Sequence, residues 1–233
     1  MPTTTAAPAA SHSVDTLYRL DQNLTATEGR VFLTGTQALL RLLLSQRRRD
    51  RQQGLNTAGF VTGYRGSPLG GVDMALWRHR DALNEHDIRF LPAINEDLAA
   101  TIVMGTQQAG VREDRSVDGV FSMWYGKGPG ADRAGDALHH GNAAGASRHG
   151  GVLLIVGDDH TAASSSIPHA SEETLAAWRI PVVHPSSVDE SWHEFFDANP
   201  GAASSSGGDS GKATGKAAGG SSGKASGKAS GQA

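Results

Sequence analysis

The stretch Gly151–His160, with the sequence GVLLIVGDDH, decides the fold class of this chain. Five consecutive apolar side chains between two glycines are typical of a strand buried on both faces, as strands of parallel sheets are. The acidic residues and the histidine that follow mark the point where such a strand leaves the core. We therefore predict that Gly151–Val156 is the clearest buried strand of an α/β protein.

Strand-like and helical stretches alternate outward from this run. Further strands are predicted at Ala58–Thr62, Ile88–Ile94, Gly119–Tyr125 and Pro181–His184. Helices are predicted from a cap at Thr34 or Thr36 to a stop at Gly54, and at Val72–His86, Glu96–Val111, Ala131–Ala146, Ser171–Trp178 and Ser186–Phe196. This alternation implies right-handed crossovers and a doubly wound, mostly parallel sheet with helices on both faces.

Ligands of such sheets bind beyond the carboxyl ends of the strands. Three glycine-rich or acidic turns are expected at that edge, namely Gly63–Gly71, Gly126–Gly130 and Gly157–His160. Tight turns need glycine for conformational reasons alone, so the turns by themselves do not identify a ligand.

Composition divides the 233 residues into parts. Residues 201–233 contain 10 Gly, 8 Ala, 8 Ser and 4 Lys, and such a segment cannot bury enough apolar surface to offset the entropy of ordering it. We expect residues 1–14 to be disordered, residues 15–200 to form one domain, and residues 201–233 to be a low-complexity tail. The basic residues of the first 200 positions are arginines except for Lys127, whereas the tail uses only lysine.

Several classes of protein are disfavoured by the same composition. The net charge of −3 argues against nucleic acid as the main partner. The chain has no cysteine, which excludes disulfides, thiolate zinc sites and cysteine-ligated iron–sulfur clusters within it. The longest apolar run, Ala38–Leu44, contains Arg41 and is too short for a membrane span. No secretory signal is visible near the start, so a cytoplasmic location is expected.

Common catalytic motifs are incomplete. Gly126-Lys127-Gly128 lacks the upstream glycine and the following hydroxyl residue of a Walker motif, and no G-x-G-x-x-G follows a strand. His139 and His140 are adjacent on a predicted helix, where they point about 100° apart and cannot share one metal ion; no metal ligands are predicted on this chain. A hydrolase using His160 and a nearby serine is a remote alternative, because no G-x-S-x-G elbow is present.

Glu96 has two interpretations. It begins a predicted helix directly after an apolar run, where a carboxylate stabilises the helix dipole. The same position would also present a carboxyl group to a ligand at the edge of the sheet, where it could exchange a proton. The residue pattern alone does not distinguish these roles.

Eight runs in the same order closely resemble the N-terminal part of the long, fused indolepyruvate ferredoxin oxidoreductases of bacteria, which are thiamine diphosphate-dependent 2-oxoacid:ferredoxin oxidoreductases. They lie within about Thr34 to Asp189, or about two thirds of the chain. The matching runs are Leu33–Leu39, Gly54–Phe60, Gly63–Gly71, Asn95–Thr101, Met123–Gly130, Ser147–Gly151, Gly157–His160 and Ile180–Val182.

The resemblance implies that residues 15–200 form the domain that holds the pyrimidine end of thiamine diphosphate. Glu96 would hydrogen-bond the pyrimidine ring nitrogen and promote the imino tautomer, which takes the proton from the thiazolium carbon. The complete enzyme would decarboxylate a 2-oxoacid oxidatively, pass electrons through iron–sulfur clusters to ferredoxin, and release an acyl-coenzyme A thioester. The cofactor is then the electron sink, and the protein supplies tautomer control and orientation.

The resemblance also assigns residues to the turn after the first strand. Tyr64–Pro68 resembles the Tyr-Pro-x-Thr-Pro turn of the wider superfamily, so Ser67 would lie beside the substrate carboxylate. Arg65 would add a positive charge near an anionic substrate. Gly66 and Lys127 complete the predicted cofactor-binding set, with no separate chemical role for Lys127.

The sequence departs from the family in one respect. The Gly-Asp-Gly run that binds magnesium and the diphosphate is absent, and Gly135-Asp136-Ala137 and Gly157-Asp158-Asp159 lack the final glycine. Magnesium, the clusters and the coenzyme A-reacting parts are therefore expected on other domains or subunits. We expect the chain to be a truncated or frame-shifted product, and a natural one-domain protein is the alternative. For its function, the alternative to an enzyme domain is a non-catalytic module that binds a partner chain. The sequence selects neither a particular 2-oxoacid nor an oligomeric state.

Overall fold

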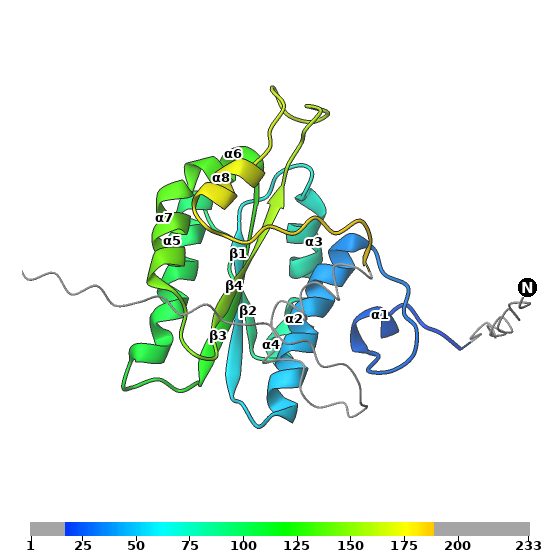
Figure 1. Cartoon of the computed structure of the whole chain (residues 1–233). Coiled ribbons are helices and arrows are strands. Elements are labelled where there is room, and N and C mark those ends of the chain that lie inside the picture. Colours follow the sequence, from blue (N-terminus) through cyan, green and yellow to red (C-terminus); the bar gives the residue numbers. More distant parts are fainter. Residues whose placement is uncertain (1–16, 189–233) are drawn as a thin grey trace, which may run out of the picture. The chain divides into compact units, whose positions relative to one another are not determined.

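The protein is described by a computed structural model over residues 17–188. Its centre is a sheet of four parallel strands, which run in the order β2-β1-β3-β4 (Figure 1). The strands are β1 (Thr57–Gly63), β2 (Ile88–Phe90), β3 (Gly119–Lys127) and β4 (Gly151–Gly157). The predicted α/β class with a parallel sheet is confirmed. The expectations for residues 1–14 and 201–233 lie outside the described residues.

Helices cover both faces of this sheet (Figure 1). One face carries α1 (Gln22–Thr25), α2 (Gly35–Gln52), α3 (Gly70–Arg78) and α4 (Arg80–Glu85). The other carries α5 (Glu96–Gln107), which continues as the 3-10 turn η1 (Gln108–Val111), together with α6 (Gly128–Arg133), α7 (Gly135–Ala144) and α8 (Glu172–Ala177). This is the arrangement of a doubly wound sheet.

The direction in which successive strands are added to the sheet reverses at β1. It first adds β2 beside β1, and then crosses through α5 to add β3 on the other side of β1. Helix α5 packs on both β1 and β3, and the backbone oxygen of Glu96, its first residue, accepts a hydrogen bond from Trp124 of β3. In doubly wound sheets this reversal is the place where the strand ends leave a crevice for a ligand.

Two apolar clusters, one on each face, stabilise the layers. The first joins Leu40 and Leu43 of α2 with Val61 of β1 and Met123 of β3, all buried. Helix α2 begins at a capping box, in which Thr34 accepts from the backbone of Gln37 while the Gln37 side chain accepts from the backbone of Thr34. The predicted cap at Thr34, rather than Thr36, is therefore confirmed.

The second cluster is built around Trp124 of β3, which is completely buried beneath small residues of α5, α6 and α7. Small side chains let these helices approach the sheet closely. The buried small residues are Ala99 and Ala100 of α5, Ala131 of α6, and Ala134 directly after α6. The low aliphatic content of the Ala131–Ala146 stretch is thus explained by a large aromatic side chain opposite.

Several predicted elements are shorter or divided. Strand β2 ends at Phe90, ahead of Pro92, which cannot donate to a strand partner. The predicted helix Val72–His86 is interrupted at His79, between α3 and α4. The predicted helix Ala131–Ala146 starts earlier, at Gly128, is interrupted at Ala134 and ends at Ala144.

The prediction that Gly151–Val156 is the clearest buried strand is wrong as to its burial, although its position is right. Within residues 17–188, β4 pairs only with β3, so its apolar side chains are partly exposed and Val152 is 40% exposed. Pro181–His184 forms no strand, because its residues lie exposed between two prolines and do not pair with β4. Most of the predicted helix Ser186–Phe196 lies outside the described residues. No helix among residues 17–188 has the length and apolarity needed to cross a membrane.

Candidate functional site

The carboxyl ends of the strands meet as predicted, at the top of Figure 1. The turn that follows β1 crosses the ends of β3 and β4. A Cβ atom built on Gly66 would lie 3.8 Å from Cβ of Lys127, and one built on Gly157 would lie 2.7 Å from Cγ of Leu69. The three predicted turns are therefore neighbours in space, and glycine permits their close approach.

Glu96 lies at the same carboxyl edge, on the face of the sheet that α5, α6 and α7 cover. Its side chain lies directly over Gly130, where an added Cβ atom would be 2.5 Å from both Cγ and Oε1 of Glu96. Its backbone oxygen accepts a hydrogen bond of 3.1 Å from Nε1 of the buried Trp124. Glu96 is thus fixed relative to β3 through its main chain, while Gly130 leaves room for its carboxyl group.

The carboxyl group of Glu96 is not used to cap α5. Asn95 is the cap residue, and its Oδ1 accepts a 2.8 Å hydrogen bond from the backbone of Leu98. Glu96 is half-buried, and its carboxyl oxygens make no hydrogen bond or ion pair within residues 17–188. A partly buried carboxyl group without a partner, at the carboxyl edge of the sheet beside β3 and α6, is available to a ligand.

The predicted substrate residues lie at the outer side of this edge. Arg65 and Ser67 are exposed, and neither side chain bonds to another residue of the described part. Lys127 is half-buried and donates a 3.3 Å hydrogen bond to the backbone oxygen of Ser164, so it ties the end of β3 to the loop after β4. Gly66 lies beside Lys127.

A polar network that the sequence did not predict holds the loop after β4. Oδ1 of Asp158 accepts 2.8 Å from the Ser171 hydroxyl and lies 3.1 Å from Nδ1 of His169, while Oδ2 accepts from the Ser171 backbone. The other ring nitrogen of His169 lies 2.8 Å from Oδ2 of Asp132. Burial alone would lower the pKa of His169, but the two carboxylates outweigh it and raise that pKa.

The next residue, Asp159, folds the tip of the same loop. The backbone amides of Ser164 and Ala163 each donate to it at 2.8 Å, and these bonds lower the pKa of Asp159 to about 2. His160 turns away from the serines, because its Nε2 lies 2.7 Å from Oε1 of Glu172. This contact gives the alternative hydrolase no histidine–serine pair.

The two adjacent histidines on α7 also have separate surroundings. The ring of His139 stacks on Trp178, while Nδ1 of His140 lies 3.3 Å from a carboxyl oxygen of Asp136. Their ring centroids are 6.4 Å apart and tilted by 53°. This geometry agrees with the expectation that they do not share a metal ion.

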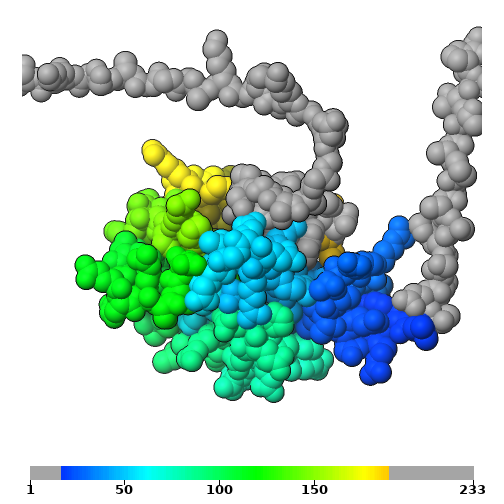
Figure 2. Space-filling view, turned by 90° about the horizontal axis from the view of Figure 1, so that it is seen from below, coloured from blue at the N-terminus to red at the C-terminus, as the bar shows by residue number. Residues whose placement is uncertain are grey.

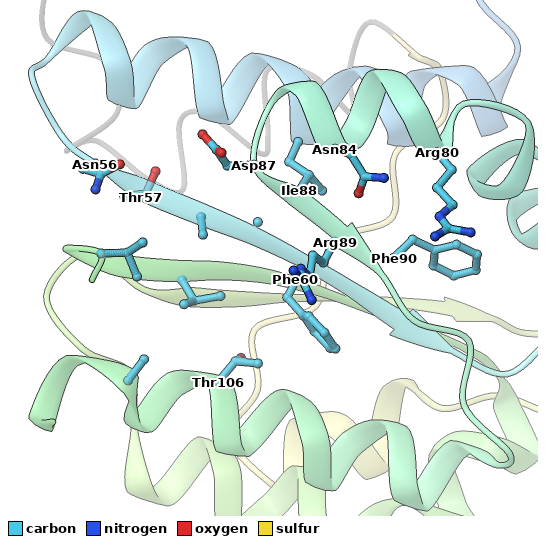
Figure 3. A pocket seen from close by; sticks show the side chains of 15 residues that line it. Asn56, Thr57, Phe60, Arg80, Asn84, Asp87, Ile88, Arg89, Phe90 and Thr106 are labelled. Carbon is cyan, nitrogen blue, oxygen red and sulfur yellow. The ribbon is translucent and has the colours of Figure 1, made fainter. Parts of the chain in front are cut away.

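A surface hollow of about 910 Å³ lies elsewhere, beside the edge strand β2 (Figure 3). Phe60, Arg89 and Thr106 line it from the α5 side, and Asn84 and Asp87 line it from the α4 side. It contains none of the predicted site residues. It exists because α5 packs on β1 and β3 but leaves β2 uncovered, and its lining shows no convergent set of catalytic groups.

The amino-terminal edge of the sheet faces the viewer in Figure 2, where the light-blue end of α2 and the segment leading into β1 lie next to the green segment after α5 and the teal α4–β2 region. There Asp118 accepts 2.7 Å from the backbone of Asn56, which joins two loops. The sequence placed no functional residue at this edge. The predicted residues Gly66, Glu96 and Lys127 lie at the opposite, carboxyl edge.

The fold and the site define a doubly wound α/β protein with a carboxyl group at the carboxyl edge of the sheet. In comparisons with family models, with curated proteins and with solved structures, nothing matches this chain. The resemblance based on the eight sequence runs therefore stays a prediction.

Proposed function

We propose that this chain is the pyrimidine-binding part of an indolepyruvate-type 2-oxoacid:ferredoxin oxidoreductase. The single observation that carries the proposal is the carboxyl group of Glu96. It is half-buried, it has no partner within residues 17–188, and it lies at the carboxyl edge of the sheet, over Gly130 of α6. A carboxyl group used only for the helix dipole would not need the space that Gly130 leaves beside it.

The residues present fit the pyrimidine end of thiamine diphosphate. When bound, that cofactor supplies the electron sink for decarboxylation. Glu96 would share a proton with a pyrimidine ring nitrogen at one of its two carboxyl oxygens. Gly130 would let the carboxyl group adopt the position it needs, and Trp124, through its 3.1 Å bond to the Glu96 backbone, would keep it there.

Arg65 and Ser67 would bind the 2-oxoacid. Both are exposed on the turn after β1, and neither is engaged by other described residues. A guanidinium group and a hydroxyl group on one turn suit a carboxylate, which accepts from both. Lys127 would act through position, because it holds this turn and the loop after β4 together.

The surface around Glu96 supports a site that is completed by another domain. Leu98 and Ile102 lie four residues apart on α5 and are 43% and 37% exposed. Ile94 and Leu91, in the segment that leads into α5, add to this exposed apolar stripe and are 82% and 49% exposed. Exposed apolar stripes of this kind mark interaction surfaces. A diphosphate-binding domain on this surface would bring magnesium, and the cysteine-free chain requires that cluster ligands also come from a partner.

The same stripe suits the second candidate, a non-catalytic module that binds a partner chain without the cofactor. Calorimetric titration with thiamine diphosphate and magnesium separates the two. We expect heat of cofactor binding when a diphosphate-binding domain of a 2-oxoacid:ferredoxin oxidoreductase is present. Partner binding without any cofactor binding would favour the non-catalytic module.

Glu96→Gln tests the proton-sharing role, and Asp97→Asn is its matched control in the same helical turn. We expect loss of partner-dependent 2-oxoacid decarboxylation in Glu96→Gln, and near-normal activity in Asp97→Asn. Wild-type turnover by Glu96→Gln would refute the assignment. Equal losses in both variants would show that only the charge at the start of α5 matters.

A further inference from the structure

Two histidines and two carboxylates gather where the loop after β4 meets the start of α8. One ligand atom each from Asp158, His160 and Glu172 lies within 4.8 Å of the others. His184 adds a second imidazole, with Nε2 3.9 Å from Oε1 of Glu172. These residues span 26 positions of sequence, so the fold, and not a local motif, brings them together.

The carboxyl group of Glu172 can accept more hydrogen bonds or cation contacts than it makes within residues 17–188. Its Oε1 is 2.7 Å from Nε2 of His160, but its Oε2 is buried and has no hydrogen-bond partner. A buried carboxylate oxygen without a partner costs free energy that a bound cation would recover. This orphaned atom is an observation separate from the clustering of the side chains.

Asp158 is already held in a fixed orientation. The backbone and hydroxyl of Ser171 each donate to it at 2.8 Å, and His169 lies 3.1 Å away. A carboxylate has about four acceptor positions, so these bonds leave capacity for a metal. Hydrogen bonds that orient a ligating group from behind are the usual support of metal sites.

We propose that Asp158, His160 and Glu172, with His184 as a fourth ligand, bind a divalent ion of the zinc class. Imidazole and carboxylate together suit zinc and its neighbours better than magnesium or calcium, which take oxygen ligands alone. Tetrahedral zinc places its ligand atoms about 3.4 Å apart. Nε2 of His160 lies 2.7 Å from Oε1 of Glu172, the three ligand atoms all lie within 4.8 Å of one another, and the exposed side chain of His160 is free to adjust. The site is independent of the proposed cofactor function.

The ion would join the loop after β4 to α8 and so stabilise the edge of the sheet. The test uses the full chain, stripped of metal with a chelator, and calorimetric titration with Zn²⁺. We expect about one ion per chain, and a rise in the melting temperature when it binds. Co²⁺ in place of Zn²⁺ should give visible absorption bands characteristic of its coordination.

His160→Ala and Glu172→Gln are the test variants, because His160 lies in the loop after β4, Glu172 is the first residue of α8, and neither belongs to the two apolar clusters. We expect each to weaken Zn²⁺ affinity at least about tenfold and to abolish the Zn²⁺-induced rise in melting temperature. His140→Ala is the control, because His140 also pairs with a carboxylate, Asp136, but belongs to no cluster of three in the described part. It should bind as wild type does. Absence of Zn²⁺ and Co²⁺ binding, or equal binding by wild type and His160→Ala, would overturn the proposal.

Discussion

Replacing Asp87 by asparagine should destabilise the protein in a pH-dependent manner. Asp87 Oδ2 accepts from Arg47 at 2.7 Å and from Arg51 at 2.9 Å, and it links the end of α2 to the start of β2. Arg47 is 4% exposed at its side chain, whereas Asp87 is 54% exposed. The residue also has a φ of 56°, which asparagine tolerates well, so the substitution removes the charge without straining the backbone.

The magnitude follows from the unequal exposure of the two partners. Breaking a fully buried ion pair costs about 3 to 5 kcal/mol, and breaking an exposed pair costs about 0 to 1 kcal/mol. Solvent screens Asp87 but not Arg47, so we expect Asp87→Asn to lower the free energy of unfolding by about 1 to 2 kcal/mol at neutral pH. Urea unfolding followed by circular dichroism measures this difference.

The pH dependence has a definite sign. The hydrogen bonds from Arg47 and then Arg51 hold the pKa of Asp87 below its usual value. Its stabilisation is therefore present above the unfolded-state pKa of about 4 and is lost as the pH falls through the lower folded-state value. The difference between wild type and Asp87→Asn should be constant near neutral pH and shrink in acid.

Asp114→Asn is the matched control, because Asp114 pairs with Arg112 at 2.8 Å but both side chains are at least 67% exposed. We expect no measurable change in its stability. The reasoning is refuted if Asp87→Asn loses the same stability at acid and neutral pH, or if Asp114→Asn is equally destabilised.

Three further substitutions test the packing of the sheet by urea unfolding. Gly63→Ala should cost about 2 kcal/mol or more, because its Cβ atom would lie 2.1 Å from the backbone oxygen of Tyr125; an unchanged stability would contradict this close approach. Gly105→Ala should stabilise α5 by about 0.5 kcal/mol, since its Cβ atom would meet nothing within 4 Å, and destabilisation would show hidden crowding. Tyr125→Phe should cost about 2 kcal/mol, because it removes the 2.7 Å hydrogen bond to the buried Asp73 carboxylate; a neutral result would mean that Asp73 finds another partner.

Strand positions were predicted well because their apolar runs are local. The predictions for β1, β3 and β4 agree with the structure to within two residues at each end, and Thr34 and Asn95 begin helices as capping chemistry indicates. The burial of β4 was predicted wrongly. An apolar run indicates that a strand can be covered on both faces. Whether that strand lies at the centre or at the edge of the sheet depends on which other strands pair with it.

The candidate site was likewise predicted in part from the sequence. Glu96 was singled out from its position at the start of a helix and from family resemblance, and both are properties of the sequence. That its carboxyl group lies over Gly130 and lacks a partner could not be read from either, because the two residues are 34 positions apart. The network of His169 between Asp132 and Asp158 was missed because histidine and aspartate at such spacing carry no signal.

The sequence by itself determined the α/β class, the order of the strands along the chain, and the turns that would follow them. It did so because periodicity, caps and glycine-rich turns act over a few residues. Only the tertiary structure decided the spatial order β2-β1-β3-β4, which places the reversal between β1 and β3, and the position of the Glu96 carboxyl group over Gly130. It also brought Asp158, His160 and Glu172 together. Such contacts depend on how whole elements pack, and the free energy of that packing is spread over residues far apart in the chain.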